Sequence, residues 1–353
     1  MRTTVPSEVT TISVDPRRDP RWRTLAATAR GSLFTSPPWI RAVSETYGYS
    51  PQARVLTDGA ESPLGGFVWV PISDIRGNRL LSLPFSDRAE PILADPTSWP
   101  SLVDDALSSK IPLQIRCWAG TAPTTDPNFT PVGEAAWHGT QLDAPLCEIF
   151  DSLKSAARRN ISAAHRNGVR VEASGGVEAV RDFHRLHVSL RKNKFGLLAQ
   201  PIDLFERIWQ EFSEFDGVVT LLARVDGDIV AGAVFLIWND VLYYKFGASL
   251  SETLRLRPND ALAWTALTWA SERKLRMVDW GLSDLQPSGL VEYKRKWASE
   301  ERRILTVRSA GWEEADNRES SQLFGELTRL LTGGDVPDHI TERAGALLYR
   351  YFA

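Results

Sequence analysis

Two kinds of hydrophobic pattern alternate along this chain. Short apolar runs rich in β-branched and aromatic residues, such as 66–72, 113–118 and 218–225, are typical of strands. Longer segments with apolar residues three and four positions apart, such as 177–194 and 201–215, are typical of amphipathic helices. This mixture predicts an α/β (α+β) protein.

The order of these elements predicts the domain organisation. In the second half, the order is helix, strand, two helices, three strands, helix, strand, helix and strand, and short turns join the three consecutive strands into an antiparallel meander. The first half follows a looser version of this order. We therefore expect two similar domains in tandem, each a mixed, mostly antiparallel sheet flanked by helices. The predicted segments are an N-terminal domain at 1–145, a C-terminal catalytic domain at 146–310 and a helical tail at 311–353 that packs on the domains.

The segment 277–297 combines a strand end with a cluster of polar and aromatic side chains. Met277 to Trp280 is short and apolar, and Gly281 is expected to end this strand because glycine accepts a positive φ. Turn residues at 287–289 then lead into a short helix. In α/β proteins, ligands tend to bind at the carboxyl ends of strands. The side chains that we expect there are Asp279, Ser283, Asp284, Tyr293, Lys294 and Trp297.

A basic, alanine-rich helix is predicted at 151–168. Asp151 opens it with a capping residue, and Gly168 stands where a helix often stops. Its arginines and the cations near 191–194 are either a phosphate-tracking patch or ordinary solvated helix faces.

Composition narrows the class of protein. The chain has 353 residues and a net charge of −3, so attraction of the whole molecule to nucleic acid is not expected. Cys117 and Cys147 are far apart and form no metal or disulfide motif. The N-terminus lacks an apolar signal core, and no run approaches the length of a membrane span, so we expect a cytoplasmic protein. The 13 tryptophans leave room for aromatic pockets.

With these motifs in hand, the chain resembles the GNAT acyltransferase superfamily and, within it, the Fem-type branch. That branch holds aminoacyl-tRNA-dependent peptidoglycan transferases and related acetyltransferases with two tandem GNAT-like domains. The resemblance covers most of residues 30–310. It is carried by 158–164 with Gly168, by 244–249 with 257–259, Trp264 and Trp269, by 279–283 with 289–297, and by 36–39 and 83–87 in the first half.

The resemblance implies transfer of an acyl group to an amine, without a covalent enzyme intermediate. In GNAT folds two strands part to admit the acyl chain, and the following helix N-terminus receives the donor's phosphates. Here that helix is expected near Pro258, but the glycine-rich loop of CoA-dependent members is replaced by 255–260, which has no glycine. This departure favours aminoacyl-tRNA or another activated acyl donor. An acyl-CoA-dependent N-acetyltransferase and a non-catalytic GNAT-like binding protein remain alternatives.

Site residues follow from the resemblance and from their positions at strand ends. Lys294 is the leading catalytic candidate, as a charge near substrate phosphate or the reacting carbonyl, and Asp279 is a candidate proton acceptor or a structural carboxylate. The candidates for substrate binding are Tyr293, Trp297, Ser283, Asp284, Tyr244, Ser86, Asp87 and Trp39. The candidates for donor-phosphate binding are Arg255, Arg257, Asn259, Arg191, Lys192, Arg158 and Arg159.

No tightly bound cofactor is expected, and the donor would act as a co-substrate. His184 and His187 share a helix face without acidic or cysteine partners, so no metal site is predicted. The acceptor amine is expected in a cleft between the domains. Its identity stays open among a cell-wall precursor, an exopolysaccharide sugar amine and a specialised-metabolite amine. The sequence does not fix the oligomeric state.

Overall fold

The computed structural model describes residues 9–312 and 314–353, which form two compact units. Unit 1 contains the chain through Glu134 together with 303–317. Unit 2 contains 135–302 together with 318–353. The segment 303–309, which the sequence-based division places in the C-terminal domain, is therefore part of unit 1.

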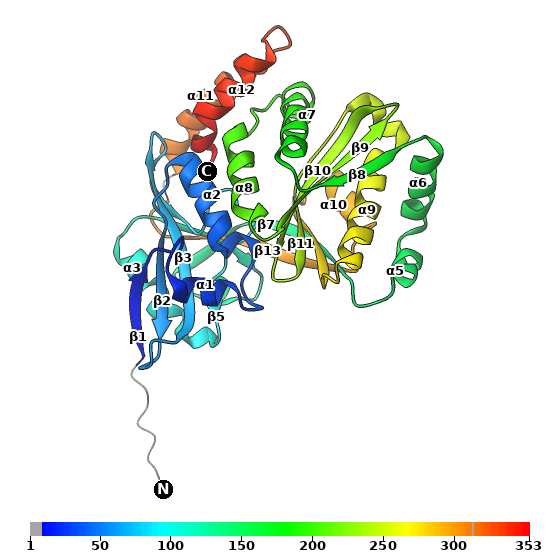
Figure 1. Ribbon diagram of the computed structural model, residues 1–353. Coiled ribbons are helices and arrows are strands. Elements are labelled where there is room, and N and C mark those ends of the chain that lie inside the picture. The colour runs from blue at the N-terminus through cyan, green and yellow to red at the C-terminus, as the bar shows by residue number, and fades with distance from the viewer. Residues whose placement is uncertain (1–8, 313) are drawn as a thin grey trace. The chain divides into compact units, whose positions relative to one another are not determined.

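The sheet of unit 1 is antiparallel apart from one pair. Its strands, in spatial order, are β1 (Thr10–Val14), β2 (Gln52–Thr57), β3 (Pro63–Asp74), β4 (Gly77–Leu81), β6 (Leu113–Trp118) and β13 (Glu300–Ser309), with the short β5 (Ile92–Leu93) beside β3. The pair β4 and β6 runs parallel, and the other pairs in this order run antiparallel. This arrangement places the strands expected at 66–72 and 113–118 in one sheet, whereas residues 135–145 of the predicted N-terminal domain belong to unit 2 (Figure 1).

Short helices cover the sheet of unit 1. They are α1 (Pro20–Ala26), α2 (Pro37–Tyr47), α3 (Trp99–Ser108) and α4 (Ala122–Thr125). Ser36 caps α2 by accepting from the N–H of Trp39, and Pro37 occupies the first turn. In the core, the buried rings of Phe67 and Trp99 pack edge to face, with their centroids 5.0 Å apart.

The sheet of unit 2 contains the parallel pair on which the site depends. Its spatial order is β7 (Phe129–Gln141), β12 (Met277–Asp284), β11 (Val241–Ser249), β10 (Asp228–Trp238), β9 (Val218–Val225) and β8 (Arg170–Ser174), where β7 belongs to this unit from Ala135 onward. β11 and β12 run parallel, and the other pairs run antiparallel. The predicted meander is therefore β9, β10 and β11.

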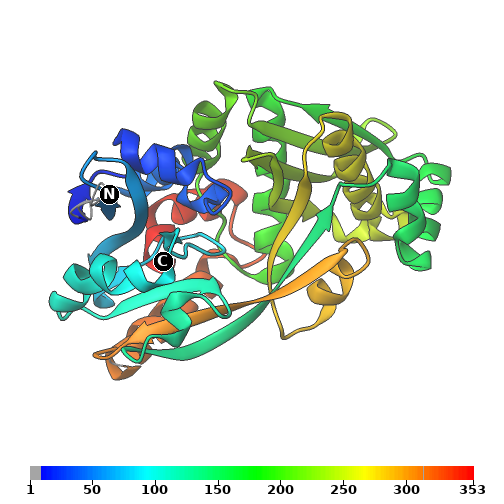
Figure 2. The same ribbon diagram turned by 90° about the horizontal axis from the view of Figure 1, so that it is seen from below.

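Two helical layers cover this sheet. The helices of unit 2 are α5 (Leu146–Ser152), α6 (Ser155–Arg166), α7 (Val177–Phe195), α8 (Ile202–Ser213), α9 (Pro258–Glu272), α10 (Gly289–Lys294), α11 (Glu314–Leu331, from residue 318) and α12 (Asp338–Leu348). Figures 1 and 2 show α7 and α8 on one face and α6 and α9 on the other. Ala157 of α6, Ala266 of α9 and Phe235 of β10 meet in one buried core. The mixed, mostly antiparallel α/β fold predicted from the sequence is confirmed.

Two predicted elements differ in detail. The single helix expected at 151–168 is split into α5 and α6, because Leu153 adopts an extended conformation and turns its side chain into the core. The strand expected to end at Gly281 continues to Asp284, since the positive φ of Gly281 (73°) makes a bulge within the strand instead of ending it. Among the described residues, no helix has both the length and the apolar character needed to cross a bilayer.

Candidate functional site

The two parallel strands of unit 2 pair over a short stretch and then part. Pairing runs from Val241 with Met277 to Tyr243 with Asp279, whereas β11 continues to Ser249 and β12 to Asp284. Residues 244–249 of β11 and 280–284 of β12 no longer pair with each other. We call this place the strand opening. On its β11 side, the register against β10 shifts between Tyr244 and Phe246, which leaves Lys245 as the extra residue of a β-bulge.

The β12 side of the strand opening is built around Gly281. Asp279 and Lys294, the two predicted catalytic residues, are both buried there. One carboxylate oxygen of Asp279 accepts from the N–H of Gly281 at 2.8 Å and from the indole N–H of Trp137 at 2.7 Å. The ammonium group of Lys294 donates to the carbonyls of Gly281 at 3.1 Å and Leu282 at 2.9 Å. The two side chains therefore fix the bulge from both sides.

These contacts distinguish the roles of the two residues. The hydrogen bonds that Asp279 accepts come from the protein's own N–H groups, which is how a positioning residue behaves. Lys294 places a compact positive charge in the wall of the strand opening. The geometry therefore favours a structural role for Asp279 and an electrostatic one for Lys294.

His138 of β7 lies in the same neighbourhood and has no place in the sequence-based site. It is fully buried, and its Nε2 atom lies 3.2 Å from the carboxylate of Glu301. The pKa of His138 is lowered, chiefly because the ring is buried. Glu301 offsets part of this lowering, and the positive charge of Lys294 adds to it. On the neighbouring strand, the hydroxyl of Ser283 is buried and has no hydrogen-bond partner among the described residues. The sequence carries no motif that links strand 137–142 to Lys294, so the position of His138 near Lys294 could not be predicted.

Aromatic side chains surround the strand opening. The ring centroids of Tyr244 and Trp280 lie 6.2 Å apart, as do those of Tyr293 and Trp297. Burial raises the pKa of Tyr244 to about 12 and that of Tyr293 well above its usual value, so both phenols are protonated at neutral pH. Tyr293 donates its hydroxyl hydrogen to the carbonyl of Asn259 at 2.8 Å. The tyrosine thereby links α10 to the first turn of α9.

The N-terminus of α9 differs from an open phosphate cradle. Pro258 has no N–H, and the N–H groups of Asp260 and Ala261 already bond to the carbonyl of Arg257, each at 3.2 Å. The Asp260 carboxylate is buried in this turn and accepts from the amide of Asn160 at 3.1 Å. Burial raises its pKa. A buried carboxyl group in this first turn disfavours a phosphate at the same helix end.

Three predicted phosphate-binding residues do gather beside this turn. Arg255 and Arg257 are exposed, and Asn259 donates to the hydroxyl of Ser249 at 3.2 Å. Arg257 adopts a positive φ of 65°, which directs the chain into α9. Any phosphate here would meet guanidinium groups rather than a row of amides.

The other predicted phosphate-binding residues do not form one patch. Arg158 and Arg159 lie on α6, whereas Arg191 and Lys192 lie on α7, which covers the opposite face of the sheet (Figure 1). Arg158 donates to the carbonyl of Asp151. Lys192 is buried and pairs with Asp338 at 2.7 Å, and Arg191 donates to the carbonyl of Leu198 at 3.0 Å. These contacts indicate that Arg191 and Lys192 serve the packing of unit 2.

Three other predicted residues lie in unit 1. The indole N–H of Trp39 donates to the Ser86 hydroxyl at 2.9 Å, and both side chains are buried. The carbonyl of Ser86 accepts from Arg116 at 3.2 Å, and Asp87 is half-buried beside it. Trp39 and Ser86 therefore form a direct pair. The cleft expected between the domains stays a prediction.

The predicted histidine pair is structural. His184 and His187 are buried on α7 and bond to the carbonyl and side-chain amide of Gln200 at 3.0 and 2.7 Å. Asp284, at the end of β12, is exposed. Within 9–312 and 314–353, no group of three histidine, cysteine, aspartate or glutamate side chains is placed to hold a metal ion.

Residues 152–295 match the family model described as an acetyltransferase (GNAT) domain. This segment lies within unit 2 and contains α6 to α10, with the strand opening near its end. None of the curated proteins compared with the sequence is a match.

Solved structures show the same fold over most of the chain. The structure of FemX is 14% identical in sequence, with a TM-score of 0.66. The match covers 84% of this chain and 96% of the FemX chain. The C-terminal domain of a putative lysylphosphatidylglycerol synthetase from Agrobacterium fabrum is 12% identical, covers 89% and 96%, and has a TM-score of 0.55. A conserved protein of unknown function from Bacteroides thetaiotaomicron is 12% identical, covers 82% and 92%, and has a TM-score of 0.52. The predicted resemblance to Fem-like GNAT proteins is confirmed in the fold.

Proposed function

We propose that this chain, whose residues 152–295 form a domain of the GNAT acyltransferase type, passes an aminoacyl or acyl group from an activated donor to an amine at the strand opening. One observation carries the proposal: β11 and β12 part at the point where Lys294 places its ammonium group against the bulge of β12. Parted strands give a donor's acyl chain access to the sheet, and a fixed cation beside them is suited to developing negative charge.

The proposed reaction needs positioning and charge stabilisation more than a protein nucleophile. The acceptor amine attacks the donor carbonyl, so that a C–N bond forms and the C–O bond of an aminoacyl ester breaks. The amine loses a proton, and the leaving hydroxyl group gains one. Lys294 would stabilise the oxyanion or the leaving oxygen, while Tyr244 and Trp280 exclude water from the carbonyl.

The first turn of α9 favours aminoacyl-tRNA over acyl-CoA as the donor. Pro258 and the buried carboxyl group of Asp260 leave few amides for a pyrophosphate. Arg255 and Arg257 are exposed beside this turn and suit the spaced phosphates of a nucleic-acid backbone. The acceptor would be a small-molecule, peptide or sugar amine.

A panel of donors in a thermal-shift experiment tests the proposal. The panel contains acetyl-CoA, free CoA, charged tRNA and the same tRNA uncharged. We expect stabilisation by charged tRNA that exceeds that by uncharged tRNA, and none by CoA. Stabilisation by CoA alone would overturn the preference for tRNA and favour the acyl-CoA-dependent acetyltransferase. No response to any donor would favour a non-catalytic binding protein.

A further inference from the structure

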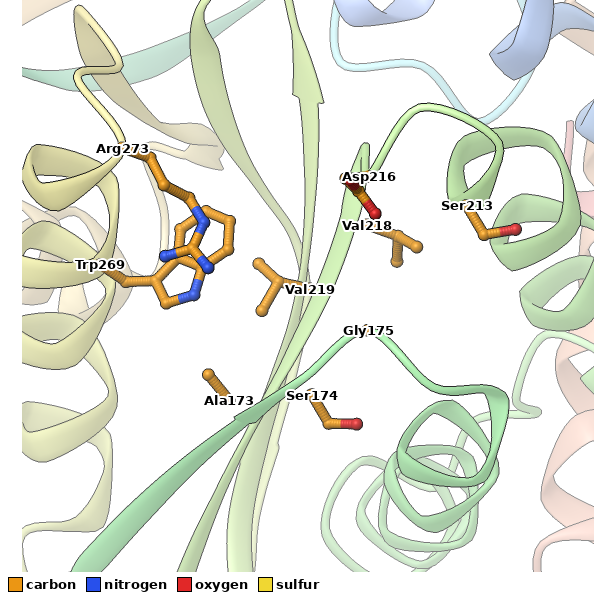
Figure 3. Close-up of a pocket in the computed structure, with 9 residues that line it drawn as sticks. All are labelled: Ala173, Ser174, Gly175, Ser213, Asp216, Val218, Val219, Trp269 and Arg273. Carbon is orange, nitrogen blue, oxygen red and sulfur yellow. The ribbon is translucent and has the colours of Figure 1, made fainter.

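A pocket of unit 2 lies between the C-terminal ends of α8 and α9, at the β8 edge of the sheet. Its volume is about 350 Å³, in the lower range of ligand pockets. In Figure 3, Trp269 and Arg273 lie on one side of the strands, and Asp216 and Ser213 lie on the other. The residues that line it are Ala173, Ser174, Gly175, Ser213, Asp216, Val218, Val219, Trp269 and Arg273.

This pocket is separate from the strand opening, although α9 extends from one to the other. The first turn of α9, at Pro258, adjoins the strand opening, and Trp269 lies near the other end of the helix. Eleven residues of α-helix separate the two positions along roughly 16 Å. The pocket therefore has no part in the proposed transfer reaction.

Opposite charges stand on two sides of the pocket. The guanidinium group of Arg273 stacks on the indole of Trp269, with its central carbon 3.7 Å from the ring centroid. Asp216 lies across the pocket in the loop after α8, at a positive φ of 54° (Figure 3). Both side chains are exposed, and neither forms an ion pair within 4.0 Å with another described residue. Each charge is thus available to a ligand.

The surface between these charges is mixed, with apolar groups from Trp269 and the valines and hydroxyl groups from Ser174 and Ser213. Val218 and Val219 at the start of β9 are buried, and the indole of Trp269 forms a wall. A simple anion would meet the carboxylate of Asp216, and a simple cation would meet the guanidinium group of Arg273. A molecule that carries both charges and an apolar group satisfies all three surfaces.

We propose that this pocket binds a free α-amino acid. Arg273 pairs with the ligand's carboxylate, Asp216 accepts from its ammonium group, and its side chain packs on Trp269 and Val219. The proposal stands apart from the acyl-transfer function, because it concerns a different pocket and a ligand that needs no activation.

Isothermal titration calorimetry of the full chain tests this site. The probes are aromatic and branched aliphatic amino acids, each with its N-acetyl and carboxamide derivatives. We expect the zwitterions to bind and each blocked derivative to bind about tenfold more weakly or worse, because one charge pair is lost. The proposal is overturned if no amino acid binds at about 10 mM, or if blocked derivatives bind as well as the zwitterions.

Matched variants locate the binding. Asp216→Asn keeps a residue that tolerates positive φ, and Arg273→Gln removes the guanidinium group; each is expected to weaken binding at least about tenfold. Lys274→Asn is the control, because Lys274 is a neighbouring exposed cation, also at positive φ (58°), that does not line the pocket. Binding that persists unchanged in both pocket variants, with melting temperatures that show folded protein, would place the ligand elsewhere and overturn the assignment.

Discussion

Asp279 and Lys294 bond to opposite sides of one residue, since the carboxylate of Asp279 accepts the N–H of Gly281 and the ammonium group of Lys294 donates to its carbonyl. Gly281 lies just beyond the last residue pair that joins β11 and β12. The backbone groups of a strand that leaves its neighbour need new partners, because buried polar groups are rarely left unpaired. These two side chains supply them, which keeps the strand opening in place.

Asp279→Asn separates a positioning role from proton abstraction. The amide oxygen of asparagine can still accept from Gly281 and Trp137, but the negative charge is lost. We expect the free energy of unfolding to fall by about 1–3 kcal/mol, while the transfer rate of folded protein stays within about tenfold of wild type. Chemical denaturation and a single-turnover assay measure the two effects. A fall in rate of about 10³ without a change in stability would instead identify Asp279 as the general base.

Gly247→Ala tests the packing of Tyr244 at the β11 bulge. A Cβ atom at position 247 would overlap the hydroxyl group of Tyr244, so the ring must move. We expect a loss of about 1–3 kcal/mol in the free energy of unfolding. In a Tyr244→Ala background the same substitution should cost less, since nothing is left to overlap. A double-mutant cycle by chemical denaturation measures this coupling, and strictly additive effects would contradict the contact.

The pH dependence of stability depends partly on His187. Its pKa is lowered from 6.5 to about 3, chiefly by burial; the hydrogen bond with Gln200 offsets part of this lowering, and Arg191 and His184 add to it. The folded state therefore resists protonation that the unfolded state accepts. This contribution to stability is complete above pH 6.5 and is lost as the pH falls from 6.5 toward 3, by up to about 1.4 kcal/mol per pH unit.

His187→Phe removes this titration while keeping an aromatic ring beside Phe183. At neutral pH the variant should be less stable by about 1–3 kcal/mol, because the side-chain oxygen of Gln200 loses its partner. Between pH 6.5 and 3 its free energy of unfolding should decline less steeply than that of wild type. Urea denaturation at a series of pH values provides the comparison, and parallel curves would show that His187 is not the titrating group.

Much of the fold could be predicted from local patterns. Gly168 stands just after α6 with a positive φ of 73°, which agrees with its expected place as a helix stop. This feature depends on residues adjacent in sequence. The predicted end of β12 at Gly281 was wrong, because a glycine at positive φ can form a bulge within a strand as well as end one.

The site was predicted less completely, because tertiary contacts decide it. The motif around Lys294 pointed to the right loop, but its bonds to 281 and 282 depend on how α10 packs against β12. His138 reaches Glu301 only through the pairing of the sheet. Likewise, the arginines of α6 and α7 look alike in sequence, yet the two helices cover opposite faces. Local charge patterns do not show which face a helix covers.

The central claim is that the charge of Lys294 at the strand opening supports acyl transfer. Lys294→Gln is compared with Lys296→Gln, which removes the same charge two residues away, using the donor and amine that give product with wild type. We expect the first variant to lose about 100-fold or more in single-turnover rate and the second to stay within about twofold. A Lys294→Gln protein that melts like wild type and transfers at the full rate would contradict the account.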